Sequence, residues 1–352
     1  MASTIIEKVQ AAAPGGFDDV VVSTPYAEGQ GFPLFVQPKD PALRDSRAAF
    51  GAWFRDHRER FDAMLAEAGA IVFRGFPLTD TASFGDLIGH YDSPKFGYSG
   101  GSSPRRNLQG RVFESTYTPP DQVIMLHQEM AYLPNWPSRI AFFCRIPAVS
   151  GGETFIADMR RVTAALDPAL VAEVETRGIR YNRNFREASL STGDSWLDAV
   201  HRSWQDAFVT TDRGEAMAAC EAMGLTAQWL DDGSLDTLYR APGMITHPRS
   251  GDRLWFNHFA TKTICPESIG QRRYDNFETY YGTTRARPYD TRFGDGTKIS
   301  GEQMNELYRV LRACRVGFAW SQGDLLLLDN YITAHGRNEY NGLRDVQVAL
   351  LQ

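Results

Sequence analysis

Cysteine is scarce in this chain, and its few copies are widely separated. The four cysteines, Cys144, Cys220, Cys265 and Cys314, include no C-x-x-C pair. The sequence therefore predicts neither a cysteine-held zinc site nor a disulfide framework, and the reducing cytoplasm is the expected location. No stretch approaches the roughly 18 apolar residues of a membrane span. The first residues also lack the apolar core of a signal peptide.

Clustered positive charge is missing as well. The formal net charge is −6, and no dense run of Lys or Arg occurs, which argues against a nucleic-acid-binding surface. Internal repeats, low-complexity tracts and a recognisable linker are absent too. The rest is ordinary globular composition, with 352 residues of which 43% are hydrophobic and 23% charged. We expect one domain spanning residues 1–352, with neither nucleic acid nor a membrane as its partner.

Short strand patterns outnumber helical ones along most of the chain. Residues 1–40 are rich in Gly, Pro and Ala and predict an irregular arm, whereas residues 43–68 carry aromatic side chains at helical spacing. Strands are predicted at 70–73, 111–117, 122–126, 139–146, 153–157, 179–183, 243–247, 253–257, 315–320, 324–330 and 345–351. Helices are predicted at 81–88, 158–177, 212–230 and 301–313, with a large helical insert at about 158–240 and a Tyr- and Arg-rich connection at 265–300. Because strict β-α-β alternation is absent, the pattern favours a mainly β, α+β fold, a sandwich or jelly roll with added helices.

Of the three H-x-[DE] patterns in the chain, one is placed to hold a metal ion. The pattern at 57–59 lies in a helical stretch, where residues two apart diverge by about 200°. The pattern at 90–92 belongs to a helix end and turn. His127 and Glu129 follow the apolar run 123–126, and residues two apart on a strand share one face. Taken alone, this tripeptide is equally consistent with an ordinary buried histidine.

His335 is the best candidate for a third ligand. It follows an apolar run, 324–334, near the end of the chain. Two histidines and one carboxylate leave the opposite positions of an ion open, which suits non-haem Fe(II) and oxygen chemistry. His258 is the alternative third ligand. Arg344 lies nine residues beyond His335 and is able to bind a carboxylate bidentately, although a surface ion pair is the simpler interpretation of a lone Arg.

The order of these motifs resembles a known family. His127-Gln-Glu129 precedes Gly151-Gly152-Glu153-Thr154, and His335-Gly-Arg with Arg344 follows. The set resembles the TauD/TfdA family of Fe(II)/2-oxoglutarate-dependent oxygenases, and within it the SyrP-like, clavaminate-synthase-like members. The shared phrases cover roughly residues 65–351: PPDQVIMLHQEMAY, FFCRIPAVSGGETFIADMR, RYNRNF, LWFNH and DNYITAHGRNEYNGLRDVQVALL.

The resemblance implies a fold and a set of cofactors. The fold is a double-stranded β-helix (jelly-roll) core with an N-terminal helical part. Fe(II) would be held by His127, Glu129 and His335, and 2-oxoglutarate would chelate it while its distal carboxylate meets Arg344 and Thr154. O2 is the further co-substrate, and succinate and CO2 are co-products. Related halogenases lack the carboxylate ligand, so Glu129 disfavours halogenation. A second Arg of taurine dioxygenase is absent near 347–349, which leaves the holder of the C1 carboxylate unidentified.

The resemblance also implies a small, amino-acid-like substrate, free or tethered to a carrier protein, in specialised natural-product metabolism. Hydroxylation of an unactivated C–H is the expected reaction, with desaturation, epoxidation and ring closure as alternatives. A non-catalytic jelly-roll protein that binds a ligand or metal, or an iron oxygenase that ignores 2-oxoglutarate, would not need the full motif set. Candidate substrate contacts, each equally readable as an ordinary surface or loop contact, are Arg105, Arg106, Arg183, Asn184 and Asn257.

Overall fold

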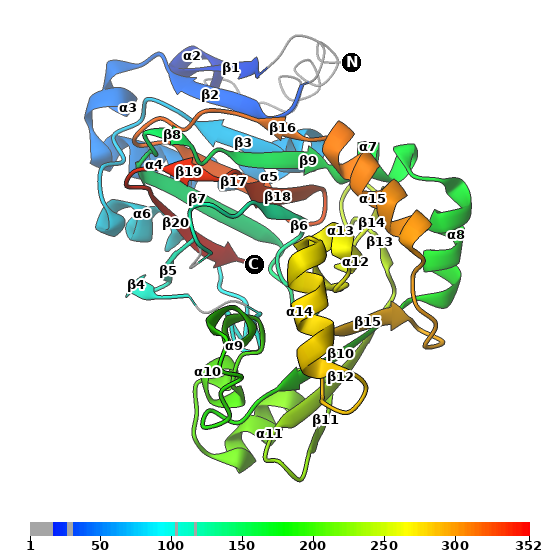
Figure 1. Ribbon diagram of the computed structural model, residues 1–352. Coiled ribbons are helices and arrows are strands. Elements are labelled where there is room, and N and C mark those ends of the chain that lie inside the picture. Colours follow the sequence, from blue (N-terminus) through cyan, green and yellow to red (C-terminus); the bar gives the residue numbers. More distant parts are fainter. Residues whose placement is uncertain (1–16, 27–30, 103–104, 116–117) are drawn as a thin grey trace.

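The computed structural model describes residues 17–26, 31–102, 105–115 and 118–352. A large and a small β-sheet form its centre, helices from the first part of the chain cover the large sheet, and an inserted segment extends away from both (Figure 1). The architecture is therefore a mixed α+β fold. Within the described ranges, no helix has the length and apolar character needed to cross a membrane.

The large sheet has eight strands and brings the two ends of the chain together. Its order is β1-β2-β3-β17-β7-β20-β5-β4. The bounds are β1 Val21–Pro25, β2 Leu34–Pro38, β3 Ala70–Phe73, β17 Leu325–Asp329, β7 Arg139–Ile146, β20 Asp345–Leu351, β5 Val112–Glu114 and β4 Asn107–Gln109. The central strand β17 is buried at every position, which explains its unbroken run of leucines.

Alternating side chains of this sheet serve two different cores. Leu325 and Leu327 pack with the aromatic residues of the covering helices. Leu326 and Leu328 point the other way and share a core with Ile156 of the small sheet. This division follows from the two-residue period of a strand, and it places a packed layer between the two sheets.

The covering helices follow the predicted pattern, but the expected irregular arm is wrong where the structure describes it. The helices are α2 Phe17–Val20, α3 Pro41–Asp45, α4 Arg47–Asp56, α5 Arg58–Ala68 and α6 Thr81–Ile88. Within residues 17–40, α2, β1 and β2 form, and β2 pairs in parallel with β3. The burial of Leu34 and Val36 is the physical reason, because this short apolar run extends the sheet. Residues 1–16 and 27–30 of the expected arm lie outside the described residues.

The small sheet carries three of the motif segments on neighbouring strands. Its order is β16-β9-β18-β6, and β8 and β19 form a separate pair beside it. The bounds are β16 Val316–Gly317, β9 Thr154–Asp158, β18 Thr333–Arg337, β6 Ile124–His127, β8 Ser150–Gly151 and β19 Tyr340–Asn341. In β9, Ile156 faces the large sheet whereas Phe155 and Ala157 face the insert. The small sheet is therefore covered on both faces.

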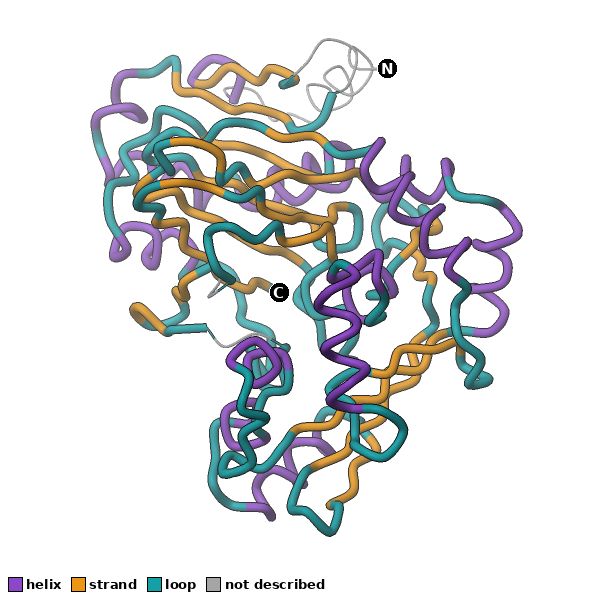
Figure 2. The backbone as a smooth tube through the Cα atoms, in the orientation of Figure 1, coloured by secondary structure: helices purple, strands orange, loops and turns teal. Residues whose placement is uncertain are grey.

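The insert between β9 and β16 is mixed rather than helical, which corrects the expected helical insert at 158–240. Its strands β11-β12-β10-β15 form a sheet of their own, seen apart from the two central sheets in Figure 2. The predicted helix at 212–230 stops early and gives way to β11, and the Tyr- and Arg-rich connection at 265–300 contains helices and a strand. The bounds are α7 Met159–Ala165, α8 Pro168–Arg177, β10 Ile179–Phe185, α9 Ser195–Val200, α10 Trp204–Phe208, α11 Arg213–Ala222, β11 Thr226–Trp229, β12 Leu235–Ala241, β13 Met244–Thr246, β14 Arg253–Trp255, α12 Phe259–Lys262, α13 Pro266–Ile269, α14 Gln271–Tyr281, β15 Asp290–Phe293 and α15 Gly301–Ala313.

Candidate metal centre

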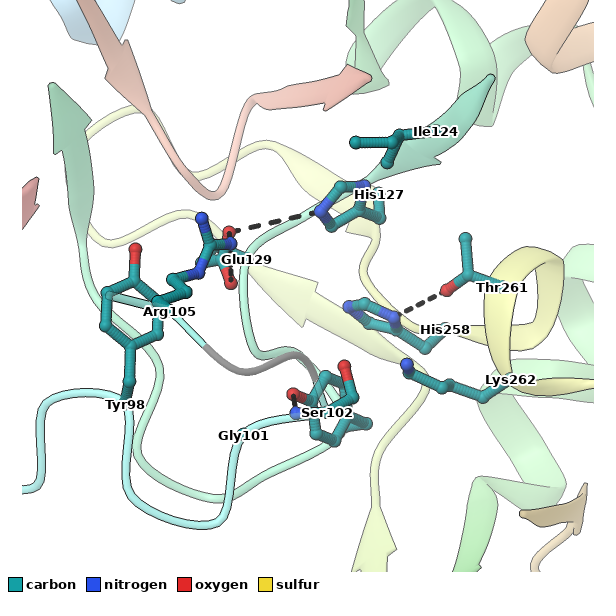
Figure 3. Close-up of a pocket in the computed structure, with 11 residues that line it drawn as sticks. Tyr98, Gly101, Ser102, Arg105, Ile124, His127, Glu129, His258, Thr261 and Lys262 are labelled. Atoms are coloured by element: carbon teal, nitrogen blue, oxygen red, sulfur yellow. Dashed lines mark hydrogen bonds and ion pairs between the residues drawn. The ribbon is translucent and has the colours of Figure 1, made fainter. Parts of the chain in front are cut away.

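A pocket opens where β6 ends, between the central sheets and the insert. His127 and Glu129 lie at its inner end, Tyr98 and Arg105 on one side, and His258 and Lys262 on the other (Figure 3). The pocket is thus built from segments far apart in the sequence. Two of its polar side chains, Arg105 and His127, approach the carboxylate of Glu129.

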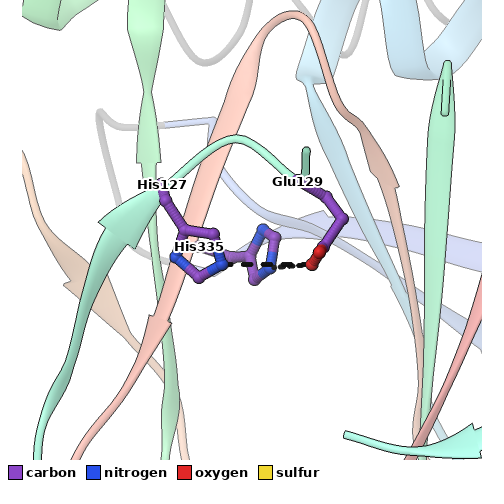
Figure 4. A group of neighbouring side chains, drawn as sticks. All are labelled: His127, Glu129 and His335. Atoms are coloured by element: carbon purple, nitrogen blue, oxygen red, sulfur yellow. Dashed lines mark ion pairs between the residues drawn. The ribbon is translucent and has the colours of Figure 1, made fainter. Parts of the chain in front are cut away.

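Three side chains at this point could hold one metal ion. The Glu129 Oε2 atom lies 3.5 Å from Nε2 of His335 and 3.9 Å from Nε2 of His127 (Figure 4). One ligand atom from each residue lies within 4.8 Å of the others. Ligands at right angles around an ion, each about 2.1 Å from it, would be about 3 Å apart. The three groups need only a small contraction to reach that geometry.

The strand register brings the two histidines together. His335 of β18 is the direct antiparallel partner of His127 of β6, and their ring centroids are 4.4 Å apart. Opposite residues of neighbouring strands project to the same face. His335 also pairs with Ile156 of β9 and contacts the ring of Phe142 on the large sheet, so this face is the one between the sheets.

The backbone of Glu129 is held by Asn330, a residue that follows β17. The amide nitrogen of Glu129 donates to Oδ1 of Asn330 over 2.7 Å, and Nδ2 of Asn330 donates back to the carbonyl of Glu129. Gln128, pointing the other way, donates to the carbonyl of Tyr331. Met130 then takes a positive φ of 59° and turns the chain away. These contacts fix the direction of the carboxylate.

The protonation of the site suits metal binding. Nδ1 of His127 donates to the carbonyl of Met125 over 2.8 Å, which leaves Nε2 with its lone pair toward Glu129. Burial, and then the neighbouring His335, lowers the pKa of His127 to about 3. Burial would raise the pKa of Glu129, but Arg105, His335 and His127 together outweigh it, and the pKa is lowered. Neutral imidazoles and an ionised carboxylate are the forms that bind a divalent metal.

Arg105 is the counter-charge of Glu129. Its Nη2 lies 3.1 Å from Oε2 of Glu129, and its guanidinium also stacks over the ring of Tyr98. Arg105 lines the pocket of Figure 3 and a second pocket on the other side of His127. Of the candidate substrate contacts, it is the one that reaches the three-residue cluster.

The second pocket contains the half-buried guanidinium of Arg344, which has no carboxylate partner among the described residues. Arg344 donates from Nε to the carbonyl of Gly152 over 3.0 Å, and Nη1 lies 3.4 Å from Oγ of Ser115. Burial, and then the like charge of Arg337, lowers the pKa of Arg344 to about 10. In the described part of the chain, no carboxylate forms an ion pair with it. The pocket therefore offers a site for an anion.

Thr154 lies in the same pocket as Arg344. Its Oγ1 accepts a hydrogen bond from Nε1 of Trp320 over 3.2 Å, so its own hydroxyl proton remains for a ligand. Thr154 is the β-partner of Arg337 in β18, and therefore projects to the same face as His335. The predicted pairing of Thr154 with Arg344 in one pocket is present.

Two glycines of the motifs make room for this pocket. Gly152 has a φ of +73°, and a Cβ there would lie 3.0 Å from Cδ of Arg344. At Gly336 a Cβ would lie 2.3 Å from Cε2 of Phe155 and 2.4 Å from the carbonyl oxygen of Ile124. The glycine after His335 therefore permits the close approach of β18 to its neighbours.

The other candidate substrate contacts serve the fold. Arg106 is exposed and pairs with Glu114. The side chains that follow are bonded to protein groups and line neither pocket. Asn184 bonds to His201, Ser234 and Asp236, and Asn257 bonds to the carbonyl of Gly243 and the amide of Phe259. Arg183 lies outside both pockets too, where it donates to the carbonyl of Gly100 and supports one wall.

His258 is a support rather than a third ligand. Its Nε2 bonds to the carbonyl of Gln128 over 2.6 Å, and its Nδ1 faces Oγ1 of Thr261 at 2.7 Å. Burial holds the pKa of His258 well below its usual value. Both ring nitrogens are thus engaged, and His335 takes the place beside Glu129.

Sequence reasoning missed Lys262 and Asn330. Lys262 is the single lysine in the stretch 254–264, where apolar residues are frequent. A lysine in such surroundings usually has a structural or functional role. That isolation was the available signal. Asn330 follows a buried strand with no local feature that marks it, and its link to Glu129 depends on the tertiary structure.

Comparisons with known proteins agree with this geometry. A family model described as taurine catabolism dioxygenase TauD, TfdA family matches residues 38–350. The dapdiamide synthesis protein DdaC of Enterobacter agglomerans is 31% identical over 306 residues, which cover 87% of this chain and 88% of that protein. A clavaminate synthase-like protein of Arabidopsis thaliana is 29% identical over 345 residues, covering 94% and 98%.

The fold is shared with solved structures. The crystal structure of a taurine dioxygenase from Burkholderia xenovorans has a TM-score of 0.51 and 13% sequence identity, over 94% of this chain and 89% of that chain. The likeness therefore runs through the central sheets and the insert alike.

Proposed function

Because this chain belongs to the taurine catabolism dioxygenase TauD, TfdA family, whose members are Fe(II)/2-oxoglutarate-dependent oxygenases, we propose that it hydroxylates an unactivated C–H of an amino acid or amino-acid-derived substrate. The observation that carries the proposal is the register of β6 and β18, which sets His127 opposite His335 beside Glu129. The donor set of two imidazoles and one carboxylate, with open positions opposite, fits Fe(II).

His127, Glu129 and His335 hold the iron in this proposal. When bound, Fe(II) and 2-oxoglutarate supply an oxidative decarboxylation in which one atom of O2 enters succinate, CO2 is released and the other atom enters the substrate as a hydroxyl. Asn330 orients the carboxylate of Glu129, and the Met125 carbonyl selects the tautomer of His127. Arg105 keeps Glu129 ionised.

Arg344 and Thr154 receive the distal carboxylate of 2-oxoglutarate. The support is the half-buried guanidinium without a carboxylate partner in the described residues and a hydroxyl already oriented by Trp320. A planar guanidinium is suited to a bidentate carboxylate, and the buried surroundings strengthen the pair. The primary substrate then occupies the pocket of Figure 3, on the other side of His127.

The fold proposal accompanies this assignment. We take the two central sheets as the double-stranded β-helix core of one oxygenase domain, with the segment from α7 to α15 as its insert. The cluster lies between the two sheets, where both walls restrict the access of water. Such seclusion favours chemistry at a chosen carbon over side reactions.

The substrate class is supported by the relatives. DdaC is named for dapdiamide synthesis, which supports a role in the making of a specialised metabolite. The amino-acid unit is either free or carried on a protein. Desaturation, epoxidation and ring closure use the same cofactors and would be recognised by the mass change of the product.

The experiment that tests the cofactor assignment is a visible spectrum without oxygen. Fe(II) and 2-oxoglutarate are added to the protein, and a metal-to-ligand charge-transfer band is expected. His335→Ala should abolish the band, whereas His90→Ala, a histidine in the turn after α6, should retain it. A wild-type protein without the band would overturn the proposal. Succinate formation with a panel of amino acids, free and carrier-loaded, then identifies the substrate.

A further inference from the structure

Lys262 stands where the pocket beside Glu129 joins a wider cavity. It is the last residue of α12, and Figure 3 shows its side chain entering the pocket next to His258, across from Arg105. Its backbone is anchored, since its amide donates to the carbonyl of His258 over 2.8 Å and its carbonyl accepts from Oγ1 of Thr291 over 2.7 Å. The wider cavity, about 690 Å³, is also lined by Lys262 and leads outward.

Three cations, of which Arg183 is buried and Lys262 and Arg202 are half-buried, gather at this point. Lys262 Nζ lies 4.9 Å from the ring centre of Tyr132 and 4.5 Å from that of Tyr289, and the guanidinium of Arg183 lies 5.1 Å and 5.4 Å from the same two rings. Arg202 joins them and donates to the carbonyl of Gly101. Among the residues that the structure describes, none of the three cations forms an ion pair.

This excess of positive charge shifts the pKa values of the neighbouring groups. Burial lowers the pKa of Lys262. Burial alone would raise the pKa of the Tyr289 hydroxyl, but the charges of Lys262, Arg183 and Arg202 together hold it below its usual value. Aromatic faces attract a cation without neutralising it. Buried charges of one sign are costly unless an opposite charge joins them.

The two arginines bond to backbone carbonyls. The ammonium of Lys262 has the hydroxyl of Tyr289 and two aromatic faces as neighbours, but no ion-pair partner among the described residues. Arg183 and Arg202 donate to the carbonyls of Gly100 and Gly101 and thereby hold the loop that forms the pocket wall. The Lys262 ammonium has three donors, and it shares the pocket with the backbone around Ser102 and the hydroxyl of Thr261. An anion is the partner that this arrangement lacks.

We propose that Lys262 binds a free carboxylate of the primary substrate. This inference rests on the proposed function, because it assigns the pocket beside His127 and Glu129 to the molecule that is oxidised. Two anion sites then lie in two pockets that share His127, one at Arg344 for 2-oxoglutarate and one at Lys262 for the substrate. The separation explains how two acids are accommodated at once.

Binding measured by calorimetry without oxygen tests the assignment. The full chain, loaded with Fe(II) and 2-oxoglutarate, is titrated with the free L-amino acids and dipeptides, each beside its C-terminal carboxamide. The amides of the acidic residues distinguish a side-chain carboxylate from a backbone one. Inorganic phosphate is included as a probe for a non-carboxylate anion. The variants are Lys262→Met, Lys262→Arg and, as a control, Lys298→Met at an exposed lysine outside both pockets.

The wild type is expected to bind at least one carboxylate roughly tenfold or more tighter than its carboxamide. Lys262→Met should lose roughly tenfold to a hundredfold for the carboxylate and little for the amide, since a hydrogen bond to a charged group is lost. Lys262→Arg should retain most of the preference, and Lys298→Met all of it. Circular dichroism checks that each variant is folded.

Three results would overturn this inference: no wild-type preference for a carboxylate, an equal loss of carboxylate and carboxamide binding in Lys262→Met, or the binding of phosphate in place of every carboxylate. Equal losses would mean that Lys262 only packs against the rings. The charge-transfer band separates this failure from a failure of the proposed function. A protein that shows the band but no carboxylate preference remains an oxygenase without a lysine-held substrate.

Discussion

Arg344→Met should separate the stability of this protein from its affinity for 2-oxoglutarate. The side chain is half-buried, and its desolvation together with the like charge of Arg337 lowers its pKa from 12.5 to about 10, which corresponds to roughly 3 kcal/mol of unfavourable electrostatic free energy. The hydrogen bonds of Arg344 to Gly152 and Ser115 stabilise the folded state by only about 1–2 kcal/mol. Methionine fills a similar volume without the charge. The free energy of unfolding without cofactors should therefore stay constant or rise by about 1 kcal/mol.

The same substitution should weaken 2-oxoglutarate binding strongly. Removing one partner of a buried charge pair costs about 2–5 kcal/mol, or roughly thirtyfold to several-thousandfold in Kd. The assay is an anaerobic titration of Fe(II)-loaded protein with 2-oxoglutarate, read by calorimetry and by the visible band. Urea unfolding of the metal-free protein gives the stability.

Two further variants sharpen the test. Arg344→Lys keeps the charge but loses the planar pair of donors, so it should fall between wild type and Arg344→Met. Arg309→Met, at an exposed arginine paired with Glu306, should change neither quantity. A folded Arg344→Met whose Kd for 2-oxoglutarate stays within about threefold of wild type would refute the role given to Arg344.

Three more predictions address other parts of the molecule. Asn330→Ala should lower Fe(II) affinity about tenfold to a hundredfold, because the backbone of Glu129 loses its bonds to the Asn330 side chain; metal titration checks it, and unchanged affinity would contradict the clamp. Gly336→Ala should lower the free energy of unfolding by about 1–3 kcal/mol, because a Cβ would overlap the ring of Phe155; urea unfolding measures it. Burial lowers the pKa of His201 to about 4. Between pH values of about 6.5 and 4, His201 is therefore neutral in the folded protein but protonated in the unfolded chain. Stability should therefore fall as the pH drops from about 6.5 to 4, and His201→Gln should flatten that slope in urea unfolding of the metal-free protein; an unchanged slope would contradict the assignment.

Local pattern proposed candidates for the metal site, and the family resemblance supplied the full set of residues. The alternation of a strand places His127 and Glu129 on one side of the chain, and the apolar run before His335 indicates a second strand. The structure brings the three together, with Thr154 and Arg344 in a neighbouring pocket. Helix spacing and capping likewise predict α6 and α15, whose N-terminal caps are Asp80 and Ser300.

Local composition and periodicity gave the wrong secondary structure for two short segments. Residues 34–36 look like part of an irregular arm, yet they extend the large sheet by pairing with β3. Residues 226–229 extend a helical pattern in the sequence but pair with β12 instead. In both places the deciding contact comes from a strand elsewhere in the chain, which local periodicity does not record.

The amino-acid sequence by itself determined which residues are able to bind a metal and a carboxylate, because side-chain chemistry and strand alternation are local properties. The tertiary structure alone decided which charges remain without a partner. The positions of Arg344 and Lys262 in two pockets that share His127 exist only after strands and helices from distant segments have packed. The same holds for the pairing of Arg105 with the carboxylate of Glu129. The physical reason is that the cost of a buried charge depends on every group that surrounds it, and those groups are assembled by the fold.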